Sequence, residues 1–97
     1  PPLRVLIAED NDDLRELLVT LISAEPDLKC VGTAADVEAV ISITTEHRAD
    51  VLVLDLELQG RSSIDLLRTV RRNGSKIKLM RILSTGHGAV QLDNGKA

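Results

Sequence analysis

The chain has 97 residues, of which 43% are apolar and none is Phe, Tyr or Trp, and its formal net charge is −3. This length allows one domain with a modest core of Leu, Val and Ile. The lack of aromatic side chains and of a basic stripe argues against nucleic-acid binding by this chain. No apolar run reaches the roughly eighteen residues that a membrane span needs.

The first predicted elements are a strand and a helix. Residues 3–8 (LRVLIA) are short, apolar and partly β-branched, which predicts a buried strand that ends at Glu9. Asn11 and Asp12 are good helix N-caps. Apolar residues then follow at helical spacing and predict one inward helix face, made of Leu14, Leu17, Leu18, Leu21 and Ile22.

The middle of the chain repeats this order. Residues 28–33 (LKCVGT) predict a more polar strand near a sheet edge, and Asp36 is suited to cap a second helix. Residues 51–54 (VLVL) form the most apolar segment and end abruptly at Asp55. The predicted inner face of the second helix consists of Val37, Val40 and Ile41.

The last third predicts a third helix and a fourth strand. Ser62 and Asp65 resemble a capping box, and residues 77–84 read as a strand followed by a glycine-rich turn. Residues 91–97 are polar and predict a tail. The inner face of this helix is predicted to contain Ile64, Leu67 and Val70. Strands that alternate with helices predict an α/β fold, with a doubly wound parallel sheet and right-handed crossovers.

Carboxylates follow two of the predicted strands. Glu9 and Asp10 close the first strand, and Asp55 closes the third. In open α/β sheets, ligands bind at the carboxyl ends of strands where the chain order reverses. A flavodoxin-like strand order 2-1-3-4 would therefore bring these three acids together. Mg²⁺ would relieve their mutual repulsion, and a carboxylate beside it can form an acyl phosphate.

Helix capping is the alternative interpretation of the acids. Acids at strand ends often cap the next helix, and Glu9 and Asp10 taken alone fit that role. The alternative is weaker for Asp55, because a charge placed directly after four apolar residues is costly unless it is paired or functional.

Three segments resemble a known family. R-V-L-I-A-E-D-N-D-D, V-L-V-L-D-L-E-L and L-S-T-G-H-G are similar to the receiver domain of two-component response regulators, from Leu3 to about Val90. The resemblance implies that Asp55 is the phosphoacceptor. It also implies a Mg²⁺ site, with its metal ligands supplied by Glu9, Asp10, Asp55 and the backbone carbonyl of Glu57.

The resemblance also covers the end of the fourth strand. Thr85 matches the hydroxyl residue that binds the phosphoryl group, and Ser84 takes this role if the strand shifts by one residue. We find no match for three features of the family: the fifth strand with its terminal lysine, the switch aromatic and the last helix. Lys96 is interpreted as a solvated charge on the polar tail. We therefore expect residues 1–97 to form a single truncated receiver domain with the fifth strand and last helix missing.

This truncation has consequences for association. The fourth strand is expected to be an exposed edge, which favours a marginal monomer or a homodimer that covers it. The chain starts at Pro1 without Met, so we expect a processed or partial chain.

The resemblance implies a signalling domain in a phosphorelay, rather than an enzyme with a separate substrate. Its expected partner is a histidine kinase or phosphotransfer protein, and self-dephosphorylation is implied. DNA and transcription regulation would involve only an output domain outside this chain. Cys30 has no internal disulfide partner, which fits the cytoplasm. The alternative is a degenerate receiver-fold interaction module without a working switch. A flavin or nucleotide carrier is a weak third interpretation, because the sequence contains neither G-x-G-x-x-G nor a P-loop.

Overall fold

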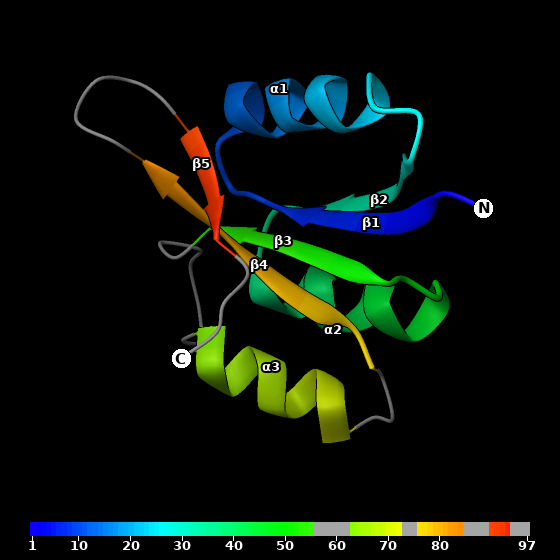
Figure 1. The fold of residues 1–97 in the computed structure, drawn as a ribbon. Coiled ribbons are helices and arrows are strands. Elements are labelled where there is room, and N and C mark those ends of the chain that lie inside the picture. The colour runs from blue at the N-terminus through cyan, green and yellow to red at the C-terminus, as the bar shows by residue number, and fades with distance from the viewer. Residues whose placement is uncertain (56–62, 73–75, 85–89, 94–97) are drawn as a thin grey trace.

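The computed structural model describes residues 1–55, 63–72, 76–84 and 90–93. Four strands run parallel in the order β2-β1-β3-β4, and a fifth, β5, pairs with β4 in the antiparallel direction (Figure 1). The order is the predicted 2-1-3-4. The elements are β1 (Leu3–Ala8), α1 (Asp12–Ser23), β2 (Leu28–Ala34), α2 (Val37–Glu46), β3 (Val51–Asp55), α3 (Ser63–Arg72), β4 (Lys78–Ser84) and β5 (Val90–Asp93).

Helices cover both faces of the sheet, as the alternating pattern predicts. Helix α1 lies on one face, and α2 and α3 lie together on the other (Figure 1). Each face has its own apolar cluster, because successive strand residues point to opposite sides. Val5, Ile7 and Val53 pack toward α1, whereas Leu6 and Leu52 pack toward α2 and α3.

The contact of α1 with the sheet is narrower than predicted. Leu18 and Ile22 are buried, and Leu14 packs at the margin of the cluster. Leu17 and Leu21 are 49% and 53% exposed, so the prediction that they face inward is wrong. Their spacing fits the inner face, but α1 presents a wider apolar stripe than the described part of the sheet covers.

The helices on the other face agree with the predicted pattern where their side chains are described. Val37 and Val40 of α2 are buried, and Ile41 packs against the same cluster. In α3, Val70 is buried as predicted, and Leu66 is buried although it was not predicted. Two further α3 residues, Ile64 and Leu67, were predicted to face inward, but their side chains are not among those described.

The predicted polar tail of residues 91–97 is wrong at its start, because a strand runs through residues 90–93. These residues form β5, in which Val90 pairs with Ser84 and Asp93 pairs with Arg81. The sequence V-Q-L-D alternates apolar and polar residues, which is the period of a strand, but a four-residue run is a weak signal. The prediction of a fully exposed β4 edge is therefore also wrong, since β5 covers its second half. A homodimer through that half of the edge has lost its structural basis.

None of the helices in the described parts of the chain is long and apolar enough to cross a membrane.

Candidate functional site

The candidate site lies at the carboxyl edge of β1 and β3. The two strands are neighbours, and Ala8 pairs with Leu54 in the last position of their register. Glu9 directly follows Ala8, and Asp55 directly follows Leu54, so the paired strands bring the backbones of Glu9 and Asp55 to the same edge of the sheet. From β1 the chain passes to β2 on one side and then to β3 on the other, so this edge is the point where strand order reverses.

Glu9 is held tightly at this edge. It is fully buried, and it is the single charged or polar residue recorded as buried in the described part of the chain. Its backbone N–H donates to Ala34 O at 2.9 Å, which continues the β1–β2 ladder. Its Oε2 accepts a hydrogen bond from the Asn11 N–H at 3.1 Å. Because burial of a carboxylate is costly without compensation, the position indicates a functional acid or a charge paired at this edge.

Asp10 differs from Glu9 in being exposed. Immediately after it, Asn11 caps α1, and its Oδ1 accepts a hydrogen bond from the Leu14 N–H at 2.9 Å. The prediction that Asn11 caps this helix is confirmed. Since the Asn11 side chain caps the first turn of α1, neither acid is needed for that bond, although Glu9 accepts from the N–H of the cap residue itself. The N-terminus of α1 also brings partial positive charge to this edge.

Arg15 supports the site from α1, and no sequence pattern predicted this role. Its Nη1 donates to the backbone oxygen of Glu9 at 2.9 Å, and its Nη2 pairs with Asp12. The bond fixes the path of the chain as it leaves β1. The helical pattern gave no signal for it, because Arg15 lies six residues from Glu9 and reaches across the first turn.

The remaining predicted site residues are placed only in part. Asp55 is the last residue of β3, but its side chain lies outside the described residues. Glu57 and Thr85 lie outside them entirely. Thr85 directly follows Ser84, the last residue of β4. The roles predicted for Asp55, Glu57, Thr85 and the alternative Ser84 therefore remain predictions.

The donor set is suited to Mg²⁺. Glu9 and Asp10 offer carboxylate oxygens at the edge where β3 ends, and Mg²⁺ prefers oxygen ligands and takes one or two carboxylates. The described side chains by themselves include no group of three His, Cys, Asp or Glu residues that could hold a metal ion. Asp55 is the predicted third carboxylate at this edge, and its side chain is not described.

Known proteins share both the sequence and the fold. Residues 5–94 match the response regulator receiver domain family. A protein-glutamate methylesterase/protein-glutamine glutaminase from Nocardioides sp. is 33% identical over 91 residues, which is 93% of this chain and 25% of that protein. The chain thus spans about a quarter of that relative's length.

Solved structures give the same result. The response regulator domain of Thermotoga maritima CheB aligns with a TM-score of 0.74 and 26% identity, covering 92% of this chain and 67% of that one. A chain from the complex of CheY6 with the phosphorylated P1 domain of CheA3 from R. sphaeroides aligns with a TM-score of 0.75. It is 23% identical and covers 92% of this chain and 79% of its own, so this likeness concerns the fold.

The fold and the site define a doubly wound α/β protein with an acidic edge at its topological switch point. The chain belongs to the response regulator receiver domain family, the signalling module of two-component systems.

Proposed function

We propose that this domain is a phosphoacceptor: Asp55 receives a phosphoryl group, and Glu9 and Asp10 hold the Mg²⁺ that the reaction requires. One observation carries the proposal. A fully buried Glu9 and an adjacent Asp10 follow β1 at the edge where β3 ends in Asp55, and β1 and β3 are neighbouring parallel strands. Membership of the receiver family supports the assignment.

The proposed transfer conserves atoms and charge. A carboxylate oxygen of Asp55 attacks the phosphorus of a phosphohistidine, the P–N bond breaks, and the imidazole nitrogen leaves with the electron pair and takes up a proton. Bound Mg²⁺ would offset negative charge on the transferring group. Besides the three carboxylates, the proposed metal site includes the Glu57 backbone carbonyl, and the Thr85 hydroxyl would donate to a phosphoryl oxygen.

Residues that the structure describes prepare this edge. Arg15 and Asn11 each form a hydrogen bond with Glu9, one at its carbonyl and one at its carboxylate. These bonds orient the acid before any metal arrives, which lowers the ordering cost of metal binding. Arg15 is a positioning residue in this proposal, since its recorded bond is to the backbone of Glu9 and not to a reacting atom.

The proposed partner is a histidine kinase or a phosphotransfer protein in the cytoplasm. The CheY6 structure, which shares the fold, was solved with the phosphorylated P1 domain of CheA3. Hydrolysis of the aspartyl phosphate by water would return the domain to its starting state. Any effect on transcription or on a methylesterase activity would require further domains, so we propose only signal reception for these residues.

Labelling with a small acyl-phosphate donor tests this function. With Mg²⁺, the unmutated chain should gain one phosphoryl group, and Asp55→Asn should gain none. Asp27→Asn removes an equally negative charge from an exposed position in the α1–β2 connection and should label normally. Equal labelling of Asp55→Asn and the unmutated chain would contradict the assignment. Failure of all three chains to label, with circular dichroism showing them folded, would favour a degenerate interaction module.

A further inference from the structure

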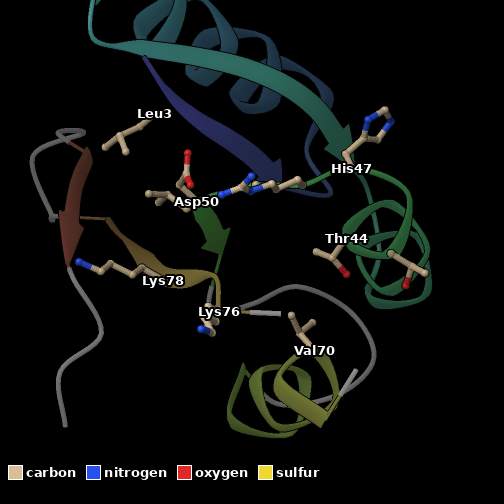
Figure 2. Close-up of a pocket in the computed structure, with 11 residues that line it drawn as sticks. Leu3, Thr44, His47, Asp50, Val70, Lys76 and Lys78 are labelled. Atoms are coloured by element: carbon tan, nitrogen blue, oxygen red, sulfur yellow. The ribbon is translucent and has the colours of Figure 1, made fainter. Parts of the chain in front are cut away.

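A second concave region lies at the opposite end of the sheet from the acids. It is a hollow of about 590 Å³ at the amino ends of β1, β3 and β4, bordered by the last turns of α2 and α3. Figure 2 shows its side chains projecting from the end of α2 (Thr44), the following connection (His47, Asp50) and the residues around the start of β4 (Lys76, Lys78). This volume lies within the range of about 300–1,000 Å³ typical of small-molecule sites.

The hollow is electropositive although the chain is acidic. Among the described residues, its lining includes the permanent cations Arg48, Lys76 and Lys78 and one carboxylate, Asp50. The whole chain has a net charge of −3. The ion pair recorded in the described residues joins Arg15 to Asp12 at the other end of the sheet, so it neutralises none of these three cations. Positive charge is therefore concentrated here against the overall balance of the molecule.

The carboxylate of Asp50 is already engaged by the protein backbone. Its Oδ2 accepts a hydrogen bond from the Arg4 N–H at 2.8 Å. The Asp50 backbone donates to Arg4 O at 2.8 Å and accepts from the Lys78 N–H at 2.9 Å. These bonds tie the starts of β1, β3 and β4 together and give the hollow a fixed base. They also direct part of the negative charge toward the backbone and away from an entering ligand.

Among the described lining residues, the polar side chains that remain for a ligand are the three cations and the His47 imidazole. Thr44 and Thr45 point their hydroxyl donors at helix carbonyls, with Oγ1 to Ile41 O distances of 3.0 and 2.9 Å respectively. An anion would therefore be bound by charge and by ammonium and guanidinium donors. Val51 and Val70 are buried and, with half-exposed Leu3, give the same hollow an apolar part.

We propose that this hollow is a binding site for a small organic anion, in which a phosphate or carboxylate group meets Arg48, Lys76 and Lys78 and a compact apolar body covers Val51 and Val70. The site is separate from the phosphoacceptor edge and does not depend on the function proposed there. Its position at the base of β3 and β4 places a bound ligand against the strands that lead to Asp55 and Thr85.

The cations have one other evident use. Cations stabilise helix C-termini, and α2 and α3 both end beside the hollow. Arg71 already places a cation in the last turn of α3, and its Nη2 donates to the backbone oxygen of Ile77 at 3.0 Å. Lys76 and Lys78 follow the end of α3 rather than belonging to its last turn. The experiment must therefore separate ligand binding from fold stability.

An NMR titration of the full chain with phenyl phosphate tests the proposal, in EDTA so that no Mg²⁺ site contributes. Backbone amides around the hollow, such as Ala49, Val51 and Lys78, should shift and saturate in the millimolar range or below. Inorganic phosphate and phenol, as the separate parts of the probe, should each bind at least about tenfold more weakly. Lys76→Gln/Lys78→Gln should weaken phenyl phosphate binding at least about tenfold.

A matched double variant controls for charge. Arg68→Gln/Arg72→Gln removes two positive charges from exposed positions of α3 that do not line the hollow, and it should retain the affinity within about twofold. Equal weakening in both double variants would show a general charge effect and overturn the proposal. The proposal would also be overturned if the unmutated chain did not bind phenyl phosphate and Lys76→Gln/Lys78→Gln had a lower melting temperature. In that case the cations would stabilise the helix ends. Shifts at the hollow that depend on protein concentration alone would show that another copy of the chain covers it, and would overturn the proposal.

Discussion

Glu9 and Asp50 are acids beside buried strands at opposite ends of the same sheet, and the structure surrounds them differently. Asp50 accepts a backbone hydrogen bond across to β1, and its own backbone bonds to β1 and β4. Glu9 is more deeply buried and lies next to Asp10, at the edge where β3 ends in another acid. The carboxylate of Asp50 therefore bonds to a neighbouring strand, whereas that of Glu9 bonds to the start of α1 beside a second acid, Asp10. Position at a strand end is therefore not enough to assign a function, and the hydrogen-bond partners decide.

The largest effect on stability is expected from Asp50. Asp50→Ala leaves the half-buried Arg4 N–H without its side-chain acceptor, which costs about 1–3 kcal/mol of unfolding free energy. For a domain of this size, each kcal/mol lowers the melting temperature by about 4–8 °C. Asp50→Asn keeps an acceptor oxygen and should lose less. Urea denaturation of both variants measures this, and Asp27→Ala is a control for an exposed acid. A loss no greater than that of the control would mean that Asp50 joins nothing.

Glu9 and Asp10 should respond to metal instead. Mg²⁺ that binds only the folded chain adds about 1.4 kcal/mol of stability when its concentration is about ten times its Kd. Asp10→Asn should reduce this gain and should raise the stability of the metal-free chain, because it relieves repulsion at the acidic edge. Thermal denaturation with Mg²⁺ or EDTA measures both effects. A melting temperature that does not respond to millimolar Mg²⁺ in the unmutated chain would show that the site is not assembled.

A smaller effect on stability is expected from substitutions of Asn11, which caps α1 and lies next to the two acids of the proposed metal site. Asn11→Ala removes the cap of α1 and should cost about 1 kcal/mol. Asn11→Asp keeps a capping oxygen but adds a carboxylate beside Glu9 and Asp10. It should therefore leave the stability in saturating Mg²⁺ nearly unchanged while lowering it in EDTA. If Asn11→Ala and Asn11→Asp lost equal stability in Mg²⁺, the capping hydrogen bond of the Asn11 side chain would not be what stabilises the fold.

Much of the fold could be predicted because each element carried its own signal. The apolar run of residues 51–54 and the caps at Asn11 and Asp36 are local features, and all three appear as predicted. The failures concern what lies next to an element. Helical spacing places Leu17 in the apolar stripe of α1, but it cannot show whether the sheet extends far enough to cover that part of the stripe. Strand β5 was missed because a four-residue alternation becomes a strand only when a neighbour is available to pair with it.

The sequence predicted at which edge of the sheet the acids lie, but it did not predict the hydrogen bonds that hold Glu9 there. Parallel strands end at a common edge, so acids after two neighbouring strands must approach one another, and the backbone register confirms that Glu9 and Asp55 follow paired residues. The bonds from Asn11 and Arg15 to Glu9 depend on how the chain turns into α1. The hollow at the other end could not be foreseen, because it joins residues from five elements and two connections that share no sequence motif.

Location of the phosphoryl group tests the central claim most directly. The unmutated chain is treated with Mg²⁺ and an acyl-phosphate donor, the acyl phosphate is trapped by borohydride reduction, and peptides are sequenced by mass spectrometry. The account predicts modification at Asp55 alone, lost when EDTA replaces Mg²⁺. Modification at Asp50, at another acid, or at Asp55 to the same extent in EDTA would contradict it.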